Sequence, residues 1–175
     1  MADAPSEDMV IYHPNREKGG SKATKAGTIL LLVASAVLIA IITIGGWSDL
    51  EGAQVISIFF IIVFALMAFF VGRWNRGVLP LASAFAIVLL VFAVIAAPGW
   101  FDRDAAGYHN PGLPPGLVGL LVVILIPLEF LLIVFAMRGF SQKWNVEIER
   151  SRDEYNRRRR NGNGRGGYQY AQSSG

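Results

Sequence analysis

Residues 116–137 read GLVGLLVVILIPLEFLLIVFAM, and Glu129 is the only ionisable residue in this stretch. A helix rises about 1.5 Å per residue, so a stretch of this length covers ~30 Å, the thickness of the hydrocarbon core of a bilayer. Similar apolar runs occupy residues 26–46, 53–72 and 79–98, and none of them contains a charged side chain. Because the runs lack the alternating pattern of barrel strands, they predict four transmembrane helices.

The composition agrees with a membrane protein and excludes other classes. The chain has 175 residues, of which 53% are hydrophobic and 17% are charged, and it has no cysteine. Apolar residues gathered in long blocks exclude a soluble enzyme domain and a long disordered chain. The lack of cysteine excludes a disulfide scaffold and a thiolate metal site.

The connections between the runs predict the topology. The links 47–52 and 73–78 are short, and short links make consecutive helices antiparallel neighbours. We therefore predict an all-α integral membrane protein whose four transmembrane helices form an up-down-up-down bundle. The expected parts are a flexible cytoplasmic N-terminal segment, the bundle, a cytoplasmic juxtamembrane amphipathic helix and a disordered tail (1–25, 26–137, 138–160 and 161–175).

The basic residues predict the orientation. Four crossings place 15 of the 16 Lys and Arg residues on the side that holds both termini, and only Arg103 on the other. Basic loops stay in the cytoplasm, so we expect a multi-pass protein of the plasma membrane with both termini cytoplasmic. The absence of cysteine and the tail rich in Arg and Gly favour a bacterial inner membrane.

Tryptophan positions agree with this topology. Trp47 and Trp100 fall at the outer ends of the runs, and Trp74 and Trp144 fall near the inner ends. Indole rings favour the headgroup level, where an apolar body meets a polar N–H group. We therefore interpret all four side chains as interfacial anchors.

The segment after the fourth run shows a helical pattern. Phe140, Trp144 and Ile148 recur every four residues with polar residues between them, which predicts a helix from about Ser141 to Arg158. It ends in a basic run that favours anionic lipid headgroups at the cytoplasmic face over nucleic acid, because only one Arg-Gly-Gly follows. The run consists of Arg157, Arg158, Arg159 and Arg160.

Glu129 is the candidate functional residue. A charged carboxylate near the bilayer centre costs ~3 kcal/mol or more, so the side chain should face the bundle interior, where desolvation favours its neutral form. Pro127 has no N–H group to donate to the carbonyl of Val123, so a kink and a free acceptor should lie near Glu129. Ser35 and Ser83 fall at a similar depth, so we predict an intramembrane polar cluster of Glu129, Pro127, Ser35 and Ser83.

No cofactor or metal site is expected. His13 and His109 lie outside the runs and on opposite sides of the membrane, which argues against axial ligation of haem and against a zinc site. The sequence contains none of the motifs of nucleotide-binding proteins, zinc proteases or serine hydrolases, so we do not expect an enzyme.

Two functions stay open. The favoured one is a non-catalytic accessory subunit, assembly factor or scaffold of a membrane complex, acting with a membrane-protein partner or as a homo-oligomer. The alternative is a small transporter or an ion or proton channel that uses Glu129. A dry bundle around Glu129 favours the first, and a polar cavity that reaches a membrane surface favours the second.

Overall fold

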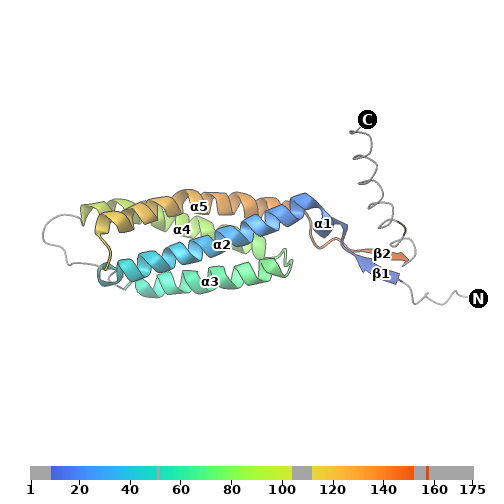
Figure 1. Cartoon of the computed structure of the whole chain (residues 1–175), viewed down its shortest axis with the longest axis horizontal. Helices are drawn as coiled ribbons and strands as arrows, with labels where there is room; N and C mark the ends of the chain where they lie inside the picture. Colours follow the sequence, from blue (N-terminus) through green and yellow to red (C-terminus); the bar gives the residue numbers. More distant parts are fainter. Residues whose placement is uncertain (1–8, 51, 104–111, 152–156, 158–175) are drawn as a thin grey trace, which may run out of the picture. The chain divides into compact units, whose positions relative to one another are not determined.

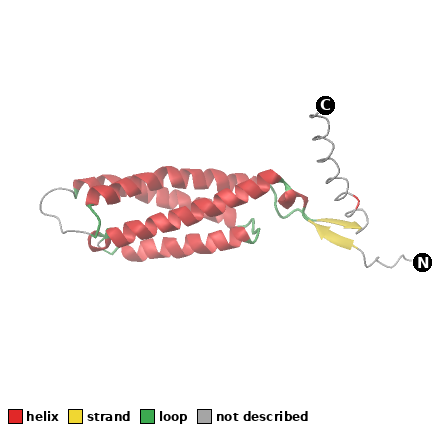
Figure 2. Ribbon diagram, in the orientation of Figure 1, coloured by secondary structure: helices red, strands yellow, loops and turns green. Residues whose placement is uncertain are grey.

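A computed structural model of the protein describes residues 9–50, 52–103, 112–151 and 157. Contacts divide the chain into two units. The larger unit, Asn15–Asn145, is helical, and the smaller one joins the two terminal segments, of which residues 9–14, 146–151 and 157 are described. Figures 1 and 2 show the helices of the larger unit and the strand pair of the smaller one.

Four long helices make up the larger unit, and consecutive helices run in opposite directions (Figure 1). All four are long and apolar enough to cross a membrane, which confirms the four predicted runs and suggests a multi-pass membrane protein. Two short helices accompany them, α1 (Pro14–Glu17) and the 3-10 turn η1 (Trp47–Asp49). The long helices are α2 (Gly19–Gly45), α3 (Gln54–Gly72), α4 (Val78–Asp102) and α5 (Pro115–Ser141).

Three of these helices extend beyond the predicted runs. The prediction of a flexible segment over 1–25 is wrong for residues 9–25, because a strand, α1 and the first turns of α2 occupy them. Inside α2 the hydroxyl groups of Thr24 and Thr28 donate to the carbonyl groups four residues earlier, so these polar side chains are satisfied within the helix. Similarly, α4 continues through Pro98 to Asp102 and includes Trp100.

The packing of the bundle is uneven. Contacts are extensive between α4 and α5, α2 and α3, and α2 and α5, but slight between α3 and α4 although a short link joins these two. Aromatic rings separate them, since Phe60 of α3 meets Phe85 and Phe92 of α4 with centroids 6.0 and 6.3 Å apart. The helices of this pair run antiparallel, as the short link predicts, but they contact each other only slightly. In contrast, α4 buries a face of small residues, namely Ala82, Ala86, Ala93 and Ala97.

The end of α3 has an unusual residue in its cap. The N–H of Asn75 donates to the carbonyl of Phe70 and the N–H of Trp74 to that of Val71, which is the bonding pattern of a Schellman motif. This motif needs a left-handed residue, usually glycine, yet Trp74 occupies the position with φ 63°. A left-handed backbone conformation costs a residue with a side chain roughly 1–2 kcal/mol. The contact of the Trp74 indole ring with Trp144, described below, offsets that cost.

The smaller unit contains a two-stranded sheet. Strand β1 (Met9–Tyr12) pairs antiparallel with β2 (Ile148–Ser151), with Val10 opposite Arg150 and Ile11 opposite Glu149. The predicted helix from Ser141 to Arg158 is therefore wrong over 148–151, because α5 ends at Ser141 and the chain becomes extended. The ladder hydrogen bonds that β1 supplies replace helical ones, an option that a local pattern does not reveal. The predicted tail, 161–175, lies outside the described residues.

Candidate functional site

Glu129 lies on the inner face of α5 and is completely buried. Ser35 of α2, also completely buried, is the polar neighbour of its carboxyl group. Within the described part of the chain, neither carboxyl oxygen of Glu129 nor Oγ of Ser35 forms a hydrogen bond of ordinary geometry. The bundle therefore encloses an acid and a hydroxyl group side by side, without the hydrogen bonds that usually compensate burial.

The other two members of the predicted polar cluster lie in different environments. Pro127 is exposed on the outward face of α5, because residues two positions apart on a helix point in nearly opposite directions. Pro127 leaves the backbone carbonyl group of Val123 without its helical hydrogen bond, and the Val123 side chain is also exposed. Ser83 of α4 is buried, but within the described part of the chain no hydrogen bond joins it to Glu129.

Enclosure limits the chemistry available to Glu129. A carboxyl group without water or a charged partner stays neutral, and in that form it can hold or release a proton only if a route to water opens. Two cavities are prominent in the structure, and Glu129 lines neither of them. The described residues of the bundle therefore enclose the acid completely.

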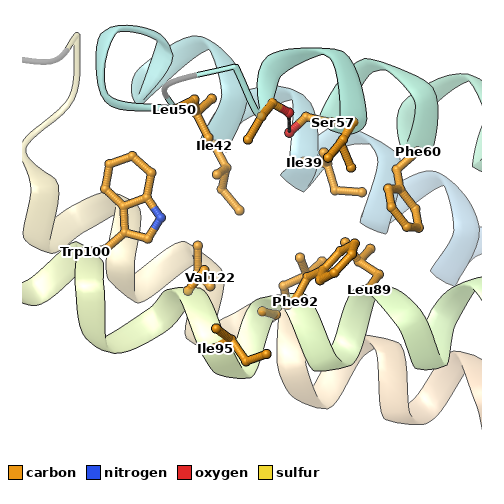
Figure 3. A pocket seen from close by; sticks show the side chains of 15 residues that line it. Ile39, Ile42, Leu50, Ser57, Phe60, Leu89, Phe92, Ile95, Trp100 and Val122 are labelled. Atoms are coloured by element: carbon orange, nitrogen blue, oxygen red, sulfur yellow. Dashed lines mark hydrogen bonds between the residues drawn. The ribbon is translucent and has the colours of Figure 1, made fainter.

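The first cavity is apolar and lies where α3 and α4 are held apart (Figure 3). Its volume is about 310 Å³, and residues from all four long helices line it. Phe60 and Phe92 close one end and Trp100 the other. The hydroxyl group of Ser57, one of its few polar groups, donates to the carbonyl of Ala53 in its own helix. Such a surface suits hydrocarbon and offers no group for catalysis.

Two of the four predicted anchors lie inside the protein. Trp47 is 53% exposed, as an interfacial anchor should be, and Trp74 is partly exposed. Trp100 and Trp144 are only 4% and 0% exposed, so the prediction that their rings meet the headgroups is wrong. Both occupy the expected ends of helices, but they fill space next to glycines, since a Cβ on Gly139 would lie 3.1 Å from the ring of Trp144.

An aromatic and basic cluster that the sequence pattern does not indicate lies at the basic end of the bundle. The rings of Trp74 and Trp144 meet edge to face with centroids 5.3 Å apart, and Lys25 Nζ lies 4.2 Å from the centre of the Trp74 ring. Trp144 Nε1 donates to Gln142 Oε1 at 2.9 Å, and Arg16 Nε donates to the backbone carbonyl of Trp144 at 3.0 Å. The cluster links the start of α2, the end of α3 and the end of α5.

The described basic residues are segregated as the sequence predicts. The start of α2, the end of α3 and the end of α5, which carry or adjoin Lys and Arg, lie together with the start of α4, and Arg103 lies at the opposite end of α4 (Figure 1). Of the predicted basic run, Arg157 is exposed. The remainder, residues 158–160, lies outside the described residues.

Comparison with known proteins identifies no relative. No protein-family model matches the chain, and no similar curated protein or solved structure was found. The evidence for a function therefore comes from the structure of the chain itself.

Proposed function

We propose that the protein is a non-catalytic accessory subunit, assembly factor or scaffold of a membrane complex. The observation that carries this proposal is the sheet formed by β1 and β2. Two strands of four residues each are too small to be stable alone in water, and a further strand or a covering surface is needed. Ile11 of β1 is 58% exposed, which adds an apolar side chain to the surface that a partner would cover.

The complete burial of Glu129 supports the same proposal. A transporter needs its intramembrane acid in contact with a water-filled path, whereas Glu129 is 0% exposed and sits beside Ser35. The sequence offers no catalytic motif that would favour an enzyme. The basic end of the bundle, with both terminal segments, would face the cytoplasm of a bacterial inner membrane, and Arg157–Arg160 would attract anionic headgroups there.

The test is a variant-dependent purification. The full chain is extracted in mild detergent, and the proteins that remain bound at constant stoichiometry are identified. Ile11→Pro removes a backbone donor from β1 and should release the partner, while Ile11→Val keeps the strand and should retain it. A partner that stays bound equally to both variants, or no stoichiometric partner at all, would contradict the proposal.

The orientation has its own test. A reporter fused after Gly175 should be active only when the C-terminus is cytoplasmic. Protease added to spheroplasts, from which the outer membrane barrier has been removed, should reach the loop between α4 and α5. A reporter that is active only outside would reverse the orientation and move the strand pair to the wrong compartment.

A second function, a proton or ion conductor, is favoured by one observation. Among the described residues neither oxygen of Glu129 has a hydrogen-bond partner, and burying such a group costs free energy unless a proton or cation uses it. Glu129→Gln keeps the shape and removes the acid, so flux in proteoliposomes should fall if the acid conducts. Ser57→Ala, which removes a hydroxyl group bonded within its own helix, is the matched control. Equal flux in wild type and Glu129→Gln would eliminate conduction through Glu129.

A further inference from the structure

The second cavity of the bundle lies at its basic end and is polar. It has a volume of about 350 Å³ and is formed where the start of α2 meets the end of α5. Gln142 Nε2 spans this junction, donating to Thr24 Oγ1 at 3.0 Å and approaching the carbonyl oxygen of Gly20 at 3.4 Å. The lining residues are Asn15, Lys18, Gly20, Ser21, Ser141, Gln142 and Lys143.

The first turn of α2 offers this cavity free backbone donors. The residue at the N-cap, Lys18, makes no side-chain cap, and its carbonyl accepts the N–H groups of Ser21 and Lys22. The N–H groups of Gly19 and Gly20 keep no protein acceptor among the described residues. A Cβ added at either glycine would meet nothing within 4 Å, so space for a ligand adjoins them. Free N–H groups at a helix start, together with the helix dipole, favour an anion.

The hydroxyl group of Ser21 is a second, independent polar feature of the cavity. Its side chain is only 3% exposed, it lines the cavity, and its hydroxyl group forms no hydrogen bond to any residue that the structure describes. Buried hydroxyl groups usually have a partner. The neighbouring Thr24 already donates to the carbonyl of Gly20, so the hydroxyl of Ser21 remains for whatever occupies the cavity.

Two lysines supply the charge. Lys18 and Lys143 both line the cavity, and both are exposed. Lys143 adopts a left-handed backbone conformation with φ 49°, and Asn15 Nδ2 donates to its carbonyl at 3.0 Å. These contacts fix the turn that brings Lys143 to the start of α2. Glu17, the nearby acidic residue, is not part of the lining.

From these contacts we infer that the cavity at the junction of α2 and α5 binds a phosphate group, held by the N–H group of Gly20, the hydroxyl of Ser21 and the ammonium groups of Lys18 and Lys143. The bilayer supplies such a group at this level. Gly20 precedes the predicted apolar run at Ala26 by ~9 Å of helix. Headgroups extend ~5–8 Å beyond each face of the hydrocarbon core, and helix tilt shortens the distance further. The ligand class is therefore an anionic phospholipid headgroup or a free phosphate.

The test is a binding titration by native mass spectrometry on the full chain in detergent. The probes are phosphatidylglycerol, diacylglycerol, which lacks phosphate, and inorganic phosphate. Lys18→Gln with Lys143→Gln should weaken phosphatidylglycerol binding by about tenfold or more, since each cation contributes to attraction. Lys22→Gln, an exposed lysine on the same turn that does not line the cavity, should leave it within about twofold.

The outcomes separate the sources and the alternatives. Phosphatidylglycerol binding that inorganic phosphate does not displace assigns the site to a lipid headgroup, and displacement at low concentration assigns it to free phosphate. The proposed site would be overturned if diacylglycerol bound as tightly as phosphatidylglycerol. It would also be overturned if Lys22→Gln weakened phosphatidylglycerol binding as much as the double variant does. If the double variant fails to fold, Ser21→Ala decides, because loss of one hydrogen bond should weaken binding about three- to tenfold. Unchanged binding in Ser21→Ala would also overturn it.

Discussion

Trp144→Ala should destabilise the bundle more than any substitution of an exposed tryptophan. The Trp144 side chain is 0% exposed, and truncation of a buried large aromatic residue to alanine costs about 3–5 kcal/mol. That range includes an edge-to-face contact with Trp74, worth about 0.5–1.5 kcal/mol. It also includes the hydrogen bond from Nε1 to Gln142, worth about 1 kcal/mol.

Two further variants divide this cost. Trp144→Phe keeps an aromatic ring but loses the hydrogen bond and part of the buried area, so we expect a loss of about 1–2 kcal/mol. Trp47→Ala is the matched control, because Trp47 is 53% exposed at the opposite end of the bundle. A substitution of an exposed side chain usually changes stability by less than about 0.5 kcal/mol.

The assay is reversible unfolding in mixed micelles, followed by circular dichroism as the fraction of denaturing detergent rises. The three variants should rank Trp144→Ala, Trp144→Phe, then Trp47→Ala in the free energy of unfolding that they lose. If Trp144→Ala and Trp47→Ala lost the same amount, Trp144 would be an interfacial anchor after all. The Trp144 ring would then not fill the junction of three helices.

Three other perturbations test separate parts of the structure. Glu129→Met should raise the free energy of unfolding by about 1–3 kcal/mol in the same assay, because it removes unpaired carboxyl oxygens; a decrease would mean that the acid holds the helices together. Gly119→Leu should cost about 1–3 kcal/mol there, since a Cβ would lie 3.1 Å from aromatic side chains of α4, whereas Gly72→Leu, which meets nothing, should cost little. Val10→Cys with Arg150→Cys should form a disulfide on oxidation, visible by gel mobility without reductant, because the two positions are paired in the sheet. A pair shifted by two residues along β2 should not, and a disulfide there instead would disprove the register.

The transmembrane helices could be predicted from sequence because the bilayer acts on every residue of a span in the same way. Twenty or so apolar residues in a row have few alternatives to a spanning helix, whatever they pack against. The burial of Glu129 follows from the same solvent argument, since lipid excludes a lone acid. The outward position of Pro127 could also have been predicted, because residues two positions apart on a helix are rotated by about 200° about its axis, and Glu129 faces inward.

The packing of the helices against one another could not be predicted from the sequence. Whether α3 and α4 touch depends on how the rings of Phe60, Phe85 and Phe92 are oriented, and sequence spacing carries no such information. The same is true of Trp74, whose left-handed conformation puts a tryptophan where glycine is usual. These features depend on contacts between helices, and their result is the apolar cavity and the indole cluster.

The strand β2 shows how two periodicities can compete in one segment. Phe140, Trp144 and Ile148 repeat every four residues, but residues 145–149, NVEIE, also alternate polar and apolar side chains, which is the pattern of a strand. Both patterns share Ile148, so the local sequence does not decide between them. Lys143 interrupts the helix with a positive φ, and β1 supplies an extended partner from the far end of the chain. A non-local partner therefore decides the conformation, and the dependence of β2 on β1 is the reason that the cross-linking experiment tests the terminal unit as a whole.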